Sequence, residues 1–244
     1  LTIDTLKLVD QIQCVSKDDA SLLRAIGLRH VEICGDTRYD QVLERLANAK
    51  PLPEHLRNSI EKRALVAGSI WREDLKPVLQ ASIATYLETP HSLLLVPHEI
   101  SEEFCAEIEK AARDFGVRKN EMIRLSILGA EANGFARKYR IVIVDTVGIL
   151  AELYMLGQIA FVGGSFRKSV HSVMEPLAAG ALTIVGPLHT NNREAIEFQN
   201  LSFDFASDST KLVTAVRDES ELREALMRLW KAADSPDVKL RIRD

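Results

Sequence analysis

The sequence has no long apolar run and no paired cysteines. Among its 244 residues, the longest apolar stretches, such as 92–97 and 140–144, have the length of a strand. A membrane-spanning helix needs roughly 20 apolar residues. The three cysteines are an odd number, and none belongs to a CxxC pair. This spacing argues against a disulfide framework and a zinc site, and it favours a reducing cytoplasm.

The sequence also has no excess of positive charge. Lys and Arg total 31, whereas Asp and Glu total 35, so the net charge is −4. This balance argues against a nucleic-acid partner, because nucleic-acid-binding domains usually carry a basic surplus. Hydrophobic residues at 46% and charged residues at 27% are typical of an ordinary soluble globular protein with one or two domains.

Strand and helix patterns alternate along the chain. The apolar runs are continuous and do not alternate every second residue, which favours a parallel sheet covered on both faces. We therefore predict an α/β fold with a doubly wound parallel sheet. The expected strands are 11–16, 30–34, 63–67, 92–96, 141–144, 159–162, 182–185 and 212–216. The expected helices are 17–26, 39–49, 73–87, 101–115, 148–156, 173–179, 193–199 and 219–233. Residues 118–139 give no clear prediction.

Two local features refine this pattern. Ser16 is expected to cap the first of these helices, and Ala20, Leu22, Leu23 and Ile26 are expected to form its buried face. Pro51 and Pro53 lie close together between two patterned regions, and proline breaks helices and stiffens linkers. We therefore expect one domain over residues 1–52 and a second over residues 53–244.

Polar and small residues follow five of the predicted strands. Ligands of open parallel sheets bind beyond the carboxyl ends of the strands, so these residues are the candidate substrate-binding site. The residues selected follow the first four of these strands. They are Gly68, Ser69, His98, Asp145, Thr146, Gly148, Gly163, Gly164, Ser165, His171, Ser172 and Glu175.

Each candidate also has a structural interpretation. The glycine run at 163–164 could hold a phosphate or form a tight turn, and it matches neither the dinucleotide-binding nor the P-loop pattern. Glu175 could accept the hydroxyls of a ribose or could stabilise a helix start. The histidines could be structural, and their spacing favours no metal. No nucleophile elbow, Cys–His pair or paired-acid pattern is present. The residues themselves indicate only a site for an anionic nucleotide.

Read in order, these segments resemble the lipid A Kdo transferases, or 3-deoxy-D-manno-octulosonic-acid transferases. The matching segments are 35–40 (GDTRYD), 68–74 (GSIWRED), 97–100 (PHEI), 145–148 (DTVG), 163–166 (GGSF), 171–176 (HSVMEP), 186–187 (GP) and 192–195 (NREA). The resemblance covers nearly the whole chain, and the combination is far more specific than any single segment.

The resemblance implies two Rossmann-like halves in the GT-B arrangement, with no cofactor and no metal. Such enzymes transfer Kdo from CMP-Kdo to a lipid A precursor at the cytoplasmic face of the bacterial inner membrane. Their C-terminal half binds the donor, and their N-terminal half carries the acceptor surface, the membrane anchor and the general base. Residues 1–52 would then be the end of the N-terminal half, so the base would lie outside this sequence. The piece alone is expected to be inactive.

The resemblance also implies a role for each candidate. Glu175 would hold the ribose hydroxyls. Gly163, Gly164, Ser165 and His171 would surround the phosphate and the Kdo carboxylate. Gly68, Ser69 and His98 would line the donor side of the cleft, and Asp145, Thr146 and Gly148 would lie near the cytidine. Three departures affect this assignment: Ser172 replaces an asparagine of the family, Ile149 replaces an acid found in many members, and Ser165 stands where others carry a glycine.

Two other functions stay open. A related GT-B transferase or an epimerase would use a UDP-sugar, which needs more donors for its second phosphate. A non-enzymatic nucleotide-binding module would keep the fold without the reaction. Preference for CMP or UDP separates the first alternative from Kdo transfer.

Overall fold

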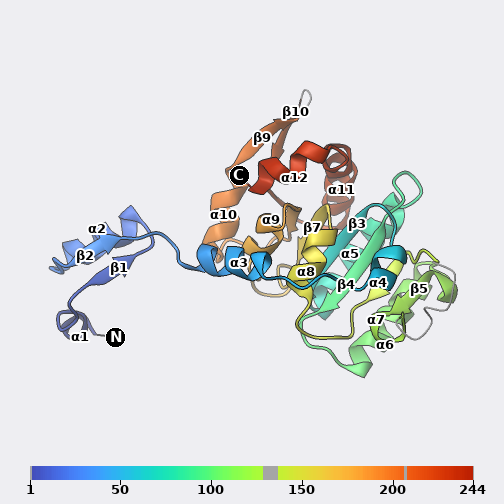
Figure 1. Ribbon diagram of the computed structural model, residues 1–244, viewed down its shortest axis with the longest axis horizontal. Coiled ribbons are helices and arrows are strands. Elements are labelled where there is room, and N and C mark those ends of the chain that lie inside the picture. Colours follow the sequence, from blue (N-terminus) through green and yellow to red (C-terminus); the bar gives the residue numbers. More distant parts are fainter. Residues whose placement is uncertain (1, 129–136, 206–207, 244) are drawn as a thin grey trace. The chain divides into compact units, whose positions relative to one another are not determined.

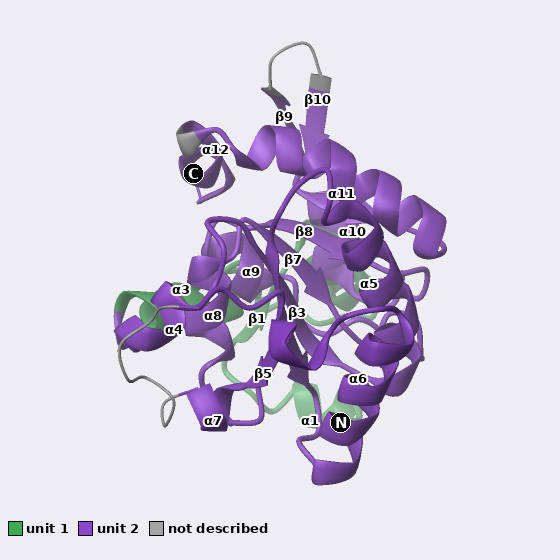
Figure 2. Ribbon diagram, turned by 90° about the vertical axis from the view of Figure 1, so that its right-hand side faces the viewer, with its two compact units in different colours: residues 1–47 green, residues 48–244 purple. Residues whose placement is uncertain are grey.

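The computed structural model describes residues 2–128, 137–205 and 208–243 of the chain. These residues form two compact units, 1–47 and 48–244 (Figure 2). The division lies N-terminal to the domain boundary that we predict after residue 52, and that boundary stays a prediction about the family's two halves.

The first unit is a small α/β segment. It contains α1 (Ile3–Leu6), β1 (Ile12–Cys14), α2 (Lys17–Ala25), β2 (Val31–Ile33) and α3 (Arg38–Ala47), and β1 pairs with β2 in parallel. Ser16 caps α2 as predicted, because its hydroxyl accepts a hydrogen bond from the N–H of Asp19 at 3.2 Å.

The predicted buried face of α2 is wrong in part. Ala20 is buried, but Leu22 is 67% exposed and Ile26 is 42% exposed. The cause is the width of the sheet: the core that contains Ala20 has only three other buried residues, Cys14, Leu28 and Val31. Two short strands cover too little surface to bury both sides of an amphipathic helix.

The second unit is built on a seven-stranded parallel sheet (Figure 1). Its order is β11-β8-β7-β3-β4-β6-β5, and every pairing is parallel. The strands are β3 (Ala64–Ile70), β4 (Ser92–Pro97), β5 (Met122–Arg124), β6 (Ile141–Ile143), β7 (Ile159–Val162), β8 (Leu182–Val185) and β11 (Val213–Ala215). The central strands are buried along their length, as their continuous apolar sequences predict.

Helices cover both faces of this sheet (Figure 2). On one face α5 (Arg72–Thr85) packs between α6 (Glu102–Asp114) and α11 (Glu219–Ala233). On the other face lie α8 (Leu150–Leu156) and α9 (Met174–Ala178), which contact each other. The remaining elements are α4 (Glu54–Asn58), the 3-10 helix η1 (Lys119–Glu121), α7 (Leu125–Leu128), α10 (Arg193–Gln199), β9 (Ser202–Phe205), β10 (Asp208–Lys211) and α12 (Pro236–Arg243). The predicted doubly wound α/β class is confirmed.

Sequence patterns missed the shortest and most peripheral elements. The stretch 118–139 contains η1, β5 and α7, and its residues 129–136 lie outside the described residues. β5 has only three residues and is held at the sheet edge by its pairing with β6. The β9–β10 hairpin and α12 were also not predicted. Unlike the central strands, the missed strands β5, β9 and β10 have no continuous apolar run that could mark them.

The strand order reverses direction between β3 and β7. The chain continues from β3 to its neighbour β4 on one side, and later returns to β7 on the other side. The loops that follow these two strands therefore diverge from a topological switch point, where doubly wound sheets bind ligands. The four strands that precede the candidate residues, β3, β4, β6 and β7, end at the same edge of the sheet, since all are parallel.

Candidate functional site

The turn after β3 has an irregular backbone. The pairing of β3 with β4 shifts register between Ala67 and Ile70, and Ser69 adopts a φ of 54°. This left-handed conformation is costly for a residue with a side chain, and such residues cluster at functional sites. At Gly68, a Cβ would collide with the buried hydroxyl of Tyr154. The turn is therefore fitted tightly to its surroundings.

The glycine turn after β7 packs directly on this backbone. A Cβ at Gly163 would collide with the carbonyl group of Ser69 and the Cα of Ile70. Gly164 has a φ of 85°, and a Cβ there would meet the carbonyl of Ser169 and the ring of His171. Gly163 is thus required for close packing of the two strand ends, and Gly164 for the conformation of its own loop.

Asp74 joins the two strand ends by hydrogen bonds. This carboxylate is fully buried in the first turn of α5, and it accepts from the N–H groups of Trp71 at 2.9 Å, Gly164 at 2.7 Å and Phe166 at 3.1 Å. Burial raises the pKa of Asp74, and the three N–H groups oppose that rise. We did not select Asp74 from the sequence, although an acid three residues into a helix that bonds back to the N-cap is a known helix-start signal.

These contacts change the interpretation of the glycine turn. The N–H of Gly163 donates to the carbonyl of Gly68 at 2.9 Å, and the N–H of Gly164 donates to Asp74. Both donors are therefore already used inside the protein. A phosphate bound near the turn would take its hydrogen bonds from other groups.

Ser165 links the ends of β7 and β8. Its buried hydroxyl donates to the carbonyl of Val162 at 3.0 Å and accepts from the N–H of Gly186 at 2.7 Å. Its own carbonyl accepts from the N–H of Leu188 at 2.9 Å. Ser165 thus fixes the loops around the turn from within.

Three rings and one guanidinium gather beside the glycine turn. The indole N–H of Trp71 donates to Nε2 of His171 at 3.1 Å, and the rings of His171 and His98 stack with centroids 4.3 Å apart. His98 also lies 4.5 Å from the Trp71 ring, and the Arg167 guanidinium lies 3.7 Å from the centroid of that ring. The structure therefore brings together two predicted residues, His98 and His171, and two that we had not selected.

His171 is half-buried in this group. Burial and the neighbouring His98 lower the pKa of His171 below its ordinary value of 6.5. Its main-chain N–H donates to the carbonyl of Gly163, and its carbonyl accepts from the side-chain amide of Asn192. The ring is therefore held from both the main chain and the side chain.

Glu175 and Ser172 occupy the start of α9. Glu175 is half-buried, and together with burial its charge raises the pKa of Tyr154, the residue that lies against Gly68. The exposed Ser172 uses its hydroxyl to accept from the N–H of Met174 at 3.3 Å. Glu175 thus acts electrostatically on Tyr154, whereas Ser172 supports the helix start.

Asp145, Thr146 and Gly148 follow β6, which β4 separates from β3. Asp145 accepts from the N–H of Ser126 at 2.9 Å and from its hydroxyl at 2.5 Å, so it stabilises the start of α7. Thr146 is half-buried, and Gly148 is exposed with a φ of 84°. Among the residues that the structure describes, no hydrogen bond joins this group to the glycine turn.

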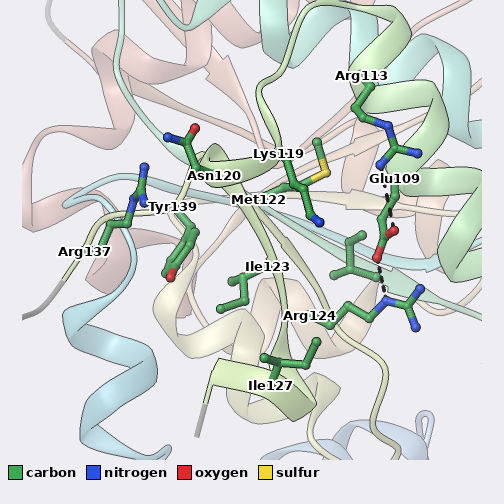
Figure 3. Close-up of a pocket in the computed structure, with 11 residues that line it drawn as sticks. Glu109, Arg113, Lys119, Asn120, Met122, Ile123, Arg124, Ile127, Arg137 and Tyr139 are labelled. Carbon is green, nitrogen blue, oxygen red and sulfur yellow. Dashed lines mark hydrogen bonds and ion pairs between the residues drawn. The ribbon is translucent and has the colours of Figure 1, made fainter. Parts of the chain in front are cut away.

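A separate pocket of about 420 Å³ lies at the β5 edge of the sheet (Figure 3). Arg113, Lys119, Arg124 and Arg137 are among its lining residues, and Arg124 is neutralised by Glu102 at 2.5 Å and Glu109 at 2.6 Å. Met122, Ile123 and Tyr139 form part of its apolar wall. None of the predicted substrate-binding residues lines this pocket.

No group of three or more His, Cys, Asp or Glu side chains in residues 2–128, 137–205 and 208–243 could hold a metal ion. Within the same ranges, no helix has both the length and the apolar character needed to cross a membrane.

No protein-family model matches the chain. Over 218 residues, 87% of its length, it is 29% identical to the 3-deoxy-D-manno-octulosonic acid transferase of Aquifex aeolicus. A second relative, from Chlamydia pneumoniae, has the same name and is 28% identical over 73% of the chain. The chain is a homologue of the Kdo transferases. It spans about half the length of these curated relatives, 54% of the first and 40% of the second.

Solved structures agree with the fold. The C-terminal CMP-Kdo binding domain of WaaA from Acinetobacter baumannii superposes with a TM-score of 0.57, covering 83% of this chain and 94% of that domain at 19% identity. The UDP-GlcNAc 2-epimerase of Neisseria meningitidis superposes with a TM-score of 0.60, covering 97% of this chain and 56% of the epimerase at 13% identity. These likenesses confirm the Rossmann-like α/β fold expected of a GT-B C-terminal half.

Proposed function

We propose that residues 53–244 are the donor-binding half of a Kdo transferase, which binds CMP-Kdo for transfer of Kdo to a lipid A precursor. The similarity to curated Kdo transferases along 87% of the chain carries this proposal. Two observations support it: the chain follows a CMP-Kdo binding domain in fold, and its tightly fitted residues lie at the switch point of the sheet. The acceptor, the cytoplasmic face of the inner membrane and the general base would involve the remainder of such an enzyme.

The ribose is the part of the donor for which this chain offers a specific partner. We assign its hydroxyls to Glu175, because a half-buried carboxylate at the start of α9 can accept two hydrogen bonds from a diol. The charge of Glu175 acts on Tyr154, whose hydroxyl lies against Gly68, and this supports a ribose near the end of β3.

We assign the phosphate and the Kdo carboxylate to the region of Gly163, Gly164, Ser165, His171 and Ser172. In this proposal the glycines and Ser165 determine the shape of the turn and do not bind the ligand directly. The N–H groups of the glycines already donate to Gly68 and Asp74, and the Ser165 hydroxyl already accepts from Gly186. His171 supplies a ring N–H. Gly68, Ser69 and His98 would line the donor side, and Asp145, Thr146 and Gly148 would lie toward the cytidine.

Isothermal titration of this chain with CMP, and with UDP as the competing nucleotide, tests the proposal. We expect CMP to bind and UDP to bind more weakly. Glu175→Ala should weaken CMP binding by about 1 to 3 kcal/mol, because a hydrogen-bonded ribose is left without its acceptor. Glu175→Gln should lose less, since the amide oxygen still accepts.

Glu197→Ala is the matched control, because Glu197 is an exposed acid on α10 that belongs to no part of the proposed site. It should leave CMP affinity unchanged. Tighter binding of UDP would replace the proposal with a UDP-sugar enzyme. Equal loss in Glu175→Ala and Glu197→Ala would remove Glu175 from the ribose. Absence of binding by either nucleotide would contradict an independent donor site in this chain.

A further inference from the structure

Trp71 is the residue that connects the ring cluster. Its indole N–H lies 3.1 Å from Nε2 of His171, and its ring contacts both His98 and the guanidinium of Arg167. Its main-chain N–H donates to Asp74, the carboxylate that also holds the glycine turn. Trp71 is therefore fixed to the same backbone as the site and is in direct contact with His171.

The hydrogen bond between the two rings has one possible direction. An indole N–H can donate and cannot accept, so Nε2 of His171 must be the acceptor. A ring nitrogen that accepts carries no proton, and the single proton of the neutral imidazole must then be on Nδ1. We propose that Trp71 is a positioning residue that holds His171 as the neutral Nδ1–H tautomer, so that the site offers an anionic ligand an imidazole N–H.

The orientation of the ring leaves this N–H for a ligand. A Cβ at Gly164 would meet Cδ2 and Nε2 of His171, so that edge of the imidazole faces the glycine turn. Nδ1 lies on the opposite edge of the five-membered ring. Among the residues that the structure describes, it has no hydrogen-bond partner, and the ring is only half-buried.

The groups around His171 also favour its neutral form. His98 stacks on the ring and disfavours a second positive charge, and burial does the same. Arg167 lies over Trp71 and is itself 3.6 Å from Glu73, and Asp74 is committed to three main-chain N–H groups. Within the described residues, no carboxylate forms a hydrogen bond or an ion pair with the ring. The hydrogen bond from Trp71 further stabilises the neutral form.

Long-range ¹H–¹⁵N spectra of the histidine side chains test the tautomer without any ligand. In the wild-type chain, we expect a protonated Nδ1 and an unprotonated Nε2 for His171 at pH 7.5. An Nε2–H tautomer there would overturn the proposal, whatever the variants do. In Trp71→Phe, which keeps an aromatic ring and loses the N–H, the pKa of His171 should rise by about half to one pH unit. An unchanged pKa would also overturn it.

The chain contains one other tryptophan, which provides the matched control. Trp230 is buried in α11, and its indole nitrogen has no hydrogen-bond partner among the described residues. Trp230→Phe makes the same chemical change at a distance from the site, so it should leave the tautomer and pKa of His171 unchanged. A shift of equal size in both variants would mean that general loosening, and not the hydrogen bond, sets the His171 pKa.

The role toward a ligand rests on the proposed function and is measured separately with CMP. At pH 8, Trp71→Phe should bind CMP about two- to ten-fold more weakly than wild type, because His171 no longer presents a fixed Nδ1–H. At pH 6 the difference in CMP affinity between the two proteins should be smaller, because His171 in the variant becomes protonated and the imidazolium again donates from Nδ1. Protonation of the CMP phosphate affects both proteins equally, so it cancels in the ratio of the wild-type affinity to the variant affinity. A ratio that does not change with pH would contradict the ligand-facing donor. Loss of CMP binding in every variant, with the spectra as expected, would contradict the proposed function alone.

Discussion

Two aspartates near the carboxyl edge of the same sheet have different structural roles. Asp74 is fully buried and accepts three main-chain N–H groups from the segments after β3 and β7. Asp145 follows β6, is half-buried and accepts both of its hydrogen bonds from Ser126. The first joins segments that are distant in sequence, whereas the second stabilises one short helix. The comparison indicates that the turns at the switch point are held rigidly and that the turn after β6 is held locally.

The largest effect is expected from removing Asp74. Asp74→Ala leaves three main-chain N–H groups without an acceptor, two of them in the glycine turn. We expect the free energy of unfolding to fall by about 3 to 5 kcal/mol. Urea denaturation followed by circular dichroism measures the loss. A loss no larger than that of Asp145→Ala would show that the two carboxylates are equivalent.

The glycines of the two regions give the next contrast. At Gly163 a Cβ would collide with backbone atoms of Ser69 and Ile70, whereas at Gly148 it would meet open space. Gly163→Ala should therefore lower the free energy of unfolding by about 2 to 3 kcal/mol. Gly148→Ala should lower it by about 1 kcal/mol, since only its φ of 84° is strained. Thermal unfolding of both variants measures these losses of stability. A greater loss in Gly148→Ala than in Gly163→Ala would contradict the prediction.

The pH dependence of the free energy of unfolding tests how burial affects the charge of Asp74. Because the pKa of Asp74 is raised in the folded protein, the native state binds this proton more tightly than the unfolded chain does. The stabilisation is present below the unfolded pKa and is lost as pH rises through the folded pKa. The difference in unfolding free energy between wild type and Asp74→Asn should therefore decrease from pH 4 to pH 7. A difference that increases over this range would mean that the three N–H groups outweigh burial.

The smallest effect is expected at Asp145. Asp145→Asn keeps one acceptor oxygen for Ser126, and the side chain is already half in contact with water. We expect a loss of less than about 1 kcal/mol in unfolding free energy. If Asp145 lies near a bound cytidine, as the resemblance implies, Asp145→Asn should reduce CMP affinity more than it reduces stability. Equal, small changes in both measurements would leave Asp145 as a helix-start residue only.

Much of the fold follows from local sequence. The strands from β6 to β8 and the helices α10 and α11 lie where continuous apolar runs and 3.6-residue periods predict them, because central elements are buried and periodic. Elements such as β5, the β9–β10 hairpin and α12 could not be predicted, because their residues gain structure from the neighbours they pack on. The predicted burial of Leu22 and Ile26 was wrong for a related reason. An amphipathic pattern predicts which face of a helix is apolar, but a neighbouring element must be present to bury that face.

The sequence by itself determined the fold class, the strand ends that carry the candidate residues and the resemblance to Kdo transferases. Each of these depends on local order along the chain: periodicity, apolar runs, and segments in a fixed sequence. Only the tertiary structure decided that Asp74 occupies the N–H of Gly164, that Trp71 donates to His171, and that Asp145 is engaged by Ser126. These contacts join residues 90, 100 and 19 positions apart. Their partners are chosen by the packing of the sheet, since short-range propensity carries no information about which distant group will satisfy a buried donor.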